Sequence, residues 1–249
     1  MGKKAGMKRN KPSRKFWLLL AAGAAVIATA VIAVVLLLPG KEDQPKATEP
    51  TGNTQIKVEL SDTKAIELGQ GLRISKIGKY AGIFMEDGSD DPVSGIMMVI
   101  LENTAEKDLQ LARFSLKYSD FTAEFEATNL PAGQSVVLLE RNRHSIVGEA
   151  PVSSDLSIVV FFEEKMSLME EQLRLSTSEG LITIENISGD DISGDIYVYY
   201  KNSATDLLYG GITYRVKFSG GLDAGEKSQV LATHYDPDTC TILQITAGG

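Results

Sequence analysis

From residue 56 to the end of the chain, hydrophobic and polar residues alternate within short segments. In FTAEFEAT, residues 121–128, the phenylalanines and alanines fall on one side and the glutamates and threonines on the other. GITYRVKF at 211–218 alternates in the same way, whereas IMMVIL at 96–101 is hydrophobic at every position. Alternation predicts strands with one buried face, and a fully apolar run predicts a central strand that is covered on both sides.

Eight further segments are rich in residues that favour strands, and turn residues separate them at the spacing typical of β-sandwiches. They begin at residues 72, 112, 135, 156, 172, 196, 229 and 241. Only residues 163–175 could hold a helical turn, and we place a module boundary within them. The pattern predicts an all-β fold with two small antiparallel β-sandwich modules, residues 56–165 and 166–249.

Two stretches, ILENTAEKDL at 100–109 and TIENISGDDI at 183–192, follow the same order of features. The residues that recur are Glu102, Asn103 and Asp108 in the first copy, Glu185, Asn186 and Asp191 in the second, and L-x-A-G at 130–133 and 222–225. One order of features over four strands predicts an internal duplication. An Asn after a strand can hydrogen-bond its own turn and a Gly accepts positive φ, so we interpret the shared residues as structural and not as an active site.

This order of strand, Asn turn, long hairpin and L-x-A-G resembles the small extracytoplasmic immunoglobulin-like modules of bacterial envelope proteins, including the FxLYD type. The residues that carry the resemblance are 184–186 and 222–226, with a looser match at 99–103 and 130–134. Tyr199, Tyr200 and Lys201 stand at the place of the LYD element. The resemblance implies immunoglobulin-like β-sandwich modules that serve as binding or spacer units and not as catalysts.

Residues 16–38 form an uncharged apolar run of 23 residues, FWLLLAAGAAVIATAVIAVVLLL. As a helix this run would span about 34 Å, which matches a bilayer core of roughly 30 Å. Seven basic residues precede the run, and the first acidic residue, Glu42, follows it. The positive-inside rule therefore predicts a single-pass transmembrane helix in the cell membrane, with a cytoplasmic basic tail at 1–15 and the C-terminal modules outside the cytoplasm.

Other interpretations of the apolar run fit less well. A cleaved signal peptide has a shorter apolar region followed by a small-residue cleavage site, and no such site follows Leu38. A lipoprotein needs a cysteine directly after the run, and the only cysteine is Cys240. We therefore interpret residues 16–38 as an uncleaved signal anchor. Residues 39–55 are rich in Pro, Gly, Thr and charge and are predicted to form a flexible linker.

The charge of the region after the basic tail argues against nucleic-acid binding. Of the 25 Lys and Arg residues seven lie in 1–15, which leaves 18 against 33 acidic residues and a formal net charge of −15. Phosphate contacts need clustered positive charge, so we expect no nucleic-acid partner. The basic tail is explained by topology and by contact with anionic lipids.

The sequence offers little catalytic or metal-binding chemistry. The only histidines, His144 and His234, follow no nucleophile pattern, and Cys240 alternates with apolar residues like a small core residue. Zinc sites need grouped Cys and His, so no metal, cofactor or catalytic residue is predicted. The acidic segments EDGSDDP at 86–92 and GDDISGD at 189–195 lack the EF-hand pattern, and we interpret them as solvated turns, with weak calcium binding as the alternative.

Six of the eight tyrosines lie between residues 197 and 235. Along DIYVYYK the alternation places Tyr197, Tyr199 and Lys201 opposite the apolar residues, and Arg215 and Lys217 take outward positions on the following strand. These five residues are predicted to form an exposed aromatic and cationic strip that binds a glycan or a protein. The alternative is that Tyr simply favours strands.

Together these features predict a membrane-anchored, extracytoplasmic and non-catalytic module of a bacterial cell envelope. Its partners would be the bilayer, through residues 16–38, and an envelope protein or wall polymer. A sensory or regulatory subunit of a membrane complex is the main alternative, and an envelope hydrolase is a more distant one. A regulatory subunit would have to signal through a partner, because only residues 1–15 would lie inside the cell.

Overall fold

The structure, a computed structural model, describes residues 56–61, 64–145, 150–178, 180–205 and 207–248. These residues are all-β, and no helix among them is long and apolar enough to span a bilayer. The predicted basic tail, transmembrane helix and linker lie outside the described residues.

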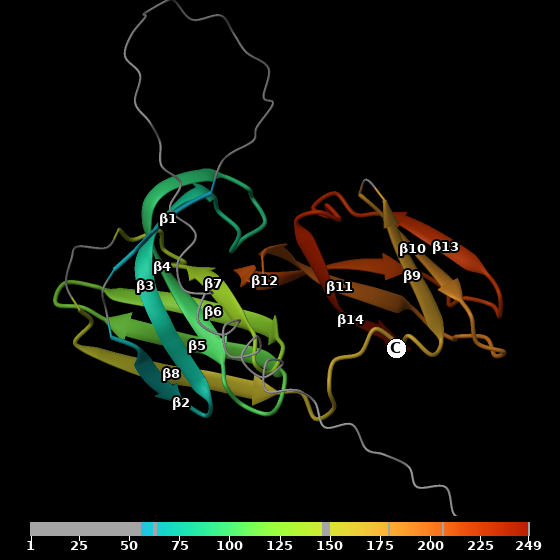
Figure 1. Cartoon of the computed structure of the whole chain (residues 1–249), viewed down its shortest axis with the longest axis horizontal. Helices are drawn as coiled ribbons and strands as arrows, with labels where there is room; N and C mark the ends of the chain where they lie inside the picture. The colour runs from blue at the N-terminus through green and yellow to red at the C-terminus, as the bar shows by residue number, and fades with distance from the viewer. Residues whose placement is uncertain (1–55, 62–63, 146–149, 179, 206, 249) are drawn as a thin grey trace, which may run out of the picture. The chain divides into compact units, whose positions relative to one another are not determined.

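Fourteen strands form the fold of the described residues. They are β1 (Lys57–Leu60), β2 (Ile66–Gly69), β3 (Leu72–Ile83), β4 (Pro92–Asn103), β5 (Leu109–Lys117), β6 (Thr122–Leu130), β7 (Ser135–Leu139), β8 (Ser153–Phe161), β9 (Leu173–Ser178), β10 (Leu181–Asn186), β11 (Ile196–Ala204), β12 (Leu207–Phe218), β13 (Lys227–Leu231) and β14 (Cys240–Ala247). Figure 1 shows them in two groups along the chain, β1 to β8 and β9 to β14.

The same pairing order occurs in both groups of strands. In the first group β4 lies between β3 and β7, and β5 lies between β6 and β8. In the second group β10 lies between β9 and β13, and β11 lies between β12 and β14. We call strands β1–β8 the first repeat and strands β9–β14 the second repeat.

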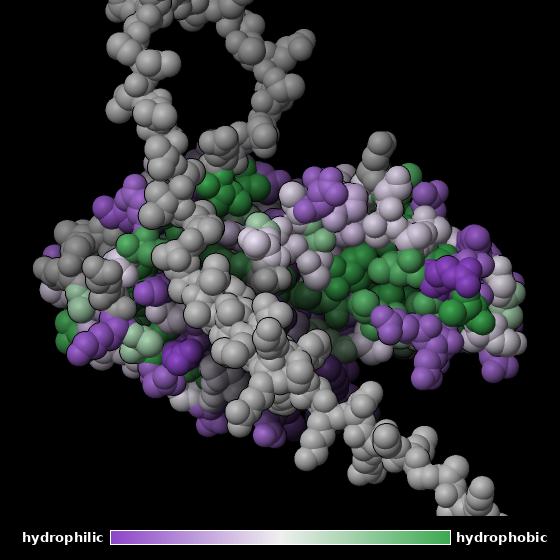
Figure 2. Space-filling view, viewed as in Figure 1, coloured by the Kyte–Doolittle hydropathy of each residue, from purple (hydrophilic) through white to green (hydrophobic). Residues whose placement is uncertain are grey.

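A hydrophobic core fills each repeat in the manner of a β-sandwich. In the first repeat, buried residues of β3 and β4 such as Ile77 and Val99 share one cluster with Phe114 and Phe125 of β5 and β6. The second repeat has its own cluster, which joins β9 and β10 to β11 and β14. In the right-hand half of Figure 2, hydrophobic residues lie over the region of β9 and β11 with hydrophilic residues around them.

One sheet continues from the first repeat into the second. Its order is β1-β3-β4-β7-β12-β11-β14, with β2 beside β3. The link is a parallel pairing of β7 with β12, in which Leu208 lies opposite Val136 and Tyr209 opposite Val137 (Figure 1). Residues 52–249 accordingly form a single compact unit.

The strand pattern of the sequence is confirmed. Ala123, Phe125 and Ala127 of β6 are buried, as the alternation predicts, and Arg215 and Lys217 of β12 are exposed. Residues 96–99 of β4 are all buried between β3 and β7. Within 163–175 the Met169 carbonyl accepts the N–H groups of Gln172 and Leu173 in a single turn, and β9 begins at Leu173, so no helix forms there.

The residues shared by the two copies make the same hydrogen bonds. The side-chain amide of Asn103 donates to the carbonyls of Lys107 and Leu130, at 3.0 Å each. Asn186 donates in the same way to Asp190 and Leu222, at 2.9 Å each. Both asparagines are buried, and each supplies from inside the fold hydrogen bonds that turn carbonyls would otherwise form with water.

The L-x-A-G segment completes this turn in both copies. Gly133 and Gly225 have φ of 76° and 78°, and each donates its N–H to the carbonyl of the Asn in its own repeat. The Asp108 carboxylate accepts the N–H of Ala132 at 2.8 Å, and the Asp191 carboxylate accepts the N–H of Ala224 at 2.9 Å. The structural interpretation of the shared residues is confirmed.

Asn186→Ala should lower the free energy of unfolding by about 1–3 kcal/mol, because it removes the two hydrogen bonds that this buried side-chain amide donates to the carbonyls of Asp190 and Leu222. Urea unfolding of the variant and the wild-type chain measures the difference. Asn142→Ala is the matched control, because Asn142 is exposed and should change stability by no more than about 0.5 kcal/mol. Equal losses in the two variants would show that the Asn turn does not stabilise the fold.

Candidate functional site

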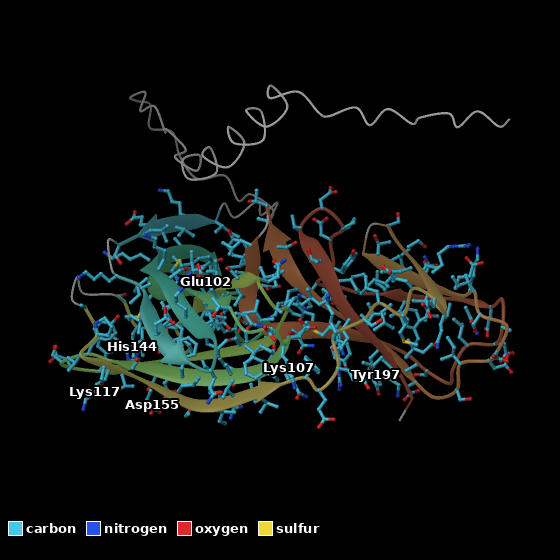
Figure 3. The ribbon with its side chains drawn as sticks, turned by 60° about the horizontal axis from the view of Figure 1, so that its bottom comes forward. Glu102, Lys107, Lys117, His144, Asp155 and Tyr197 are labelled. Carbon is cyan, nitrogen blue, oxygen red and sulfur yellow. The ribbon has the colours of Figure 1, made fainter. Side chains whose placement is uncertain are left out.

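Strand β11 presents two tyrosines on the outer face of its sheet. Ile196, Val198 and Tyr200 are buried, and Tyr197 and Tyr199 between them are partly exposed. The prediction that these two tyrosines point away from the core is therefore confirmed. Tyr197 lies in the second repeat, well separated from His144 of the first (Figure 3).

Four of the five predicted strip residues come together around Tyr197. Its ring centre lies 6.4 Å from that of Tyr199, 5.1 Å from the Arg215 guanidinium carbon and 6.0 Å from Lys217 Nζ. The register explains this, because Tyr197 lies opposite Lys217 and Tyr199 opposite Arg215 in the β11–β12 pair. Cations within about 6 Å of a ring face are attracted by its quadrupole. We call Tyr197, Tyr199, Arg215 and Lys217 the aromatic–cationic strip.

An ion pair fixes one end of the strip. Lys217 Nζ lies 2.5 Å from Asp195 Oδ2. The hydrogen bond between them raises the pKa of Lys217 and lowers the pKa of Asp195. Both groups stay charged near neutral pH, so the strip presents aromatic rings beside fixed charges.

Lys201 does not belong to the strip, and the prediction that it is exposed is wrong. Its side chain is buried, with 0% exposed. Between the pairs Tyr200–Tyr214 and Asn202–Tyr209, β11 contributes one residue and β12 contributes residues 210–213. This bulge brings the carbonyls of residues 210–212 around Lys201 and covers a position that the alternation of β11 predicts to be exposed.

The bulge forms a carbonyl cage for the Lys201 ammonium group. Nζ donates to the carbonyls of Gly210, Gly211 and Ile212 at 2.8, 3.0 and 2.6 Å. An ammonium group has three donors, so all of them are used. Gly210 has φ of 86°, a conformation that Gly adopts without strain.

Glu86 faces the same bulge from the first repeat. Its carboxylate accepts the N–H of Gly211 at 2.7 Å and the N–H of Leu139 at 2.8 Å. Burial raises the pKa of Glu86, and the two N–H donors and the Lys201 charge oppose that rise. Burial lowers the pKa of Lys201, and the Glu86 charge opposes that shift. We call Lys201, Glu86 and residues 210–212 the junction cluster.

A further set of hydrogen bonds joins β6 to β12 beside the junction cluster. Thr128 Oγ1 donates to the Gly211 carbonyl at 2.7 Å and lies 2.8 Å from Thr213 Oγ1. Both repeats thus supply polar groups to the same short segment of β12.

The acidic segment 86–92 is held by protein partners. Arg143 pairs with Asp87 and Asp91 at 3.2 Å each, and His234 Nδ1 lies 3.1 Å from Asp90 Oδ2. Hydrogen bonds from Ser89 and then from Arg143 hold the pKa of Asp87 below its usual value. The described residues contain no group of three or more potential metal-ligating side chains.

The two histidines lie in different settings. His144 Nδ1 is 3.1 Å from the buried Glu140 carboxylate, and its ring packs on Phe121. The His234 ring stacks on Tyr214, with centroids 5.0 Å apart. Their side-chain partners are thus carboxylates and aromatic rings. Cys240 is a buried core residue, as predicted, and burial raises the pKa of its thiol.

Comparison of the chain with models of protein families, with curated proteins and with solved structures finds no match. The resemblance to FxLYD-type modules therefore stays a prediction that depends on the residues quoted for it. The function has to be argued from the strip and the fold.

Gly211→Ala should lower the free energy of unfolding by about 2 kcal/mol or more. A Cβ atom at this position would overlap the Glu126 carbonyl oxygen and lie 2.5 Å from Glu86 Oε2. Gly189→Ala is the matched control, because a Cβ there meets nothing within 4 Å. Urea unfolding measures both variants. If Gly211→Ala were as stable as Gly189→Ala, the junction cluster would not be closely packed.

Proposed function

We propose that the chain is a membrane-anchored, non-catalytic binding or assembly module of a cell envelope, which docks a protein or a wall polymer outside the cytoplasm. The apolar run at 16–38 and the seven basic residues before it support the anchor and its orientation. This support comes from the sequence, since both segments lie outside the described residues.

The proposal includes two immunoglobulin-like β-sandwich modules after the anchor. The strand order that recurs in the two repeats supports it, and so do the matching turns at Asn103 and Asn186. Modules of this kind act as spacers and as platforms for surface residues, so a binding role fits the architecture.

The observation that carries the proposal is the aromatic–cationic strip on β11 and β12. Tyr197 and Tyr199 are only partly covered, and Arg215 and Lys217 flank Tyr197. Tyrosine rings offer an apolar face and a hydroxyl group at low conformational cost, which suits contact with a sugar ring or a protein side chain. Arg and Tyr are also the residues that contribute most to binding at protein interfaces.

The strip is prearranged for binding. Tyr199 lies directly opposite Arg215 and Tyr197 opposite Lys217, on neighbouring strands of a sheet that extends through both repeats. Side chains held on paired strands lose little freedom when a partner binds. The ion pair of Lys217 with Asp195 restricts the cationic end further.

Replacing both tyrosines, Tyr197→Ala with Tyr199→Ala, should weaken binding by about tenfold or more, because two stacking contacts are lost. The full chain is tested for co-sedimentation with insoluble bacterial wall polymer and, in cells, for crosslinking to a membrane or envelope protein. The first assay detects a polymer ligand and the second a protein partner.

The control for this experiment is the pair Tyr197→Phe with Tyr199→Phe, which keeps both rings and should retain most of the binding. Unfolding curves of the Ala pair and the Phe pair establish that both variants are folded. Wild-type binding by the Ala pair in both assays would show that the strip is not the binding surface.

A further inference from the structure

Strand β1 is an exposed edge strand with apolar side chains. It ends the eight-stranded sheet and pairs with β3 along one side, and no strand of the described chain pairs with its other side. Ile56, Val58 and Leu60 alternate along it and are 43%, 38% and 52% exposed. A free edge with an apolar stripe is a template for pairing with another strand.

The hydrogen bonds of β1 show which backbone groups remain free to pair. Ser61 donates its N–H to the Ile77 carbonyl of β3 at 2.9 Å. In an antiparallel pair the hydrogen-bonding residues alternate, so Lys57 and Glu59 also face β3. The backbone N–H and C=O groups of Val58 and Leu60 therefore face the free edge.

We propose that β1 pairs with β1 of a second copy of the chain, antiparallel and centred on Val58. In this register Val58 lies opposite Val58 of the second copy, and Ile56 lies opposite Leu60. Lys57 lies opposite Glu59 of the second copy, and the two-fold axis produces that ion pair twice. All the outward-facing backbone groups of 56–60 then find partners, and the apolar stripe continues across the axis.

The charges select this register over its neighbours. A shift of two residues in one direction would place Lys57 opposite Lys57, and a shift in the other would place Glu59 opposite Glu59. Like charges opposite each other destabilise an antiparallel pair, and opposite charges stabilise it. A shift of one residue would set outward-facing groups against groups already bonded to β3. The segment IKVEL is thus self-complementary in one register, which favours a second copy over an unrelated strand.

Close approach of β1 to its own sheet keeps this edge in place. A Cβ atom at Gly78 of β3 would overlap the Glu59 carbonyl, so a glycine lets β1 lie against β3. Ser61 adds a side-chain hydrogen bond to the Ile77 carbonyl at 2.7 Å. The edge is therefore fixed at residues 57–61 and available to a partner on its outer side.

The test is disulfide formation in the full chain carrying Val58→Cys. Directly opposite residues of a hydrogen-bonded antiparallel pair have Cα atoms about 5.5 Å apart, within the range of a disulfide. Under mild oxidation, Val58→Cys should give about tenfold more covalent dimer on a non-reducing gel than Val152→Cys. Val152 is the matched control because it is 73% exposed, so random collision would crosslink it at least as readily.

Charge reversal tests the register itself. In the Val58→Cys chain, adding Glu59→Lys or Lys57→Glu should each reduce the covalent dimer about tenfold, and adding both together should restore it. All these side chains are exposed, and thermal unfolding verifies that each variant is folded. Equal crosslinking of Val58→Cys and Val152→Cys would overturn the proposal. It would also be overturned if a single charge reversal left the amount of covalent dimer unchanged, or if the double reversal did not restore it.

Discussion

The buried ammonium group of Lys201 is the constraint around which the two repeats are joined. Removing an ammonium group from water is costly, and the chain offsets that cost with three carbonyls at 2.6 to 3.0 Å. Three consecutive carbonyls converge on one point only if β12 leaves its regular pleat, which explains the Gly210–Gly211 bulge. The first repeat approaches the same bulge through Glu86, which accepts the Gly211 N–H.

This junction explains why the two repeats form one compact unit. The parallel pairing of β7 with β12 has only two residue pairs, too few to hold the repeats together by itself. Glu86 and Thr128 of the first repeat form hydrogen bonds with the segment of β12 that makes the Lys201 cage. These polar contacts are satisfied only in the assembled unit. The β11–β12 pair that carries the aromatic–cationic strip begins directly beyond this junction.

Much of the fold follows from local sequence pattern. The alternation of apolar and polar residues predicted the strands. The turns at Asn103 and Asn186 could also be predicted, because each Asn bonds a carbonyl only four residues later and the same motif occurs in both copies. The burial of Lys201 could not be predicted in this way, because a bulge in β12, where four residues oppose one of β11, brings carbonyls around its side chain. The paired glycines at 210 and 211 were the available signal, since glycine inside a strand marks a bulge or a close approach. Glu86 lies 125 residues from Gly211, and no local pattern connects them.

We infer that the junction cluster makes the two repeats a single cooperative structure. Native-state hydrogen exchange of the full chain measures it directly, through the opening free energies of buried amides in β4 of the first repeat and β10 of the second. We expect one shared opening free energy for the most protected amides of the two strands. A clearly lower opening free energy for β10, with β4 still protected, would contradict it and show that the repeats unfold independently.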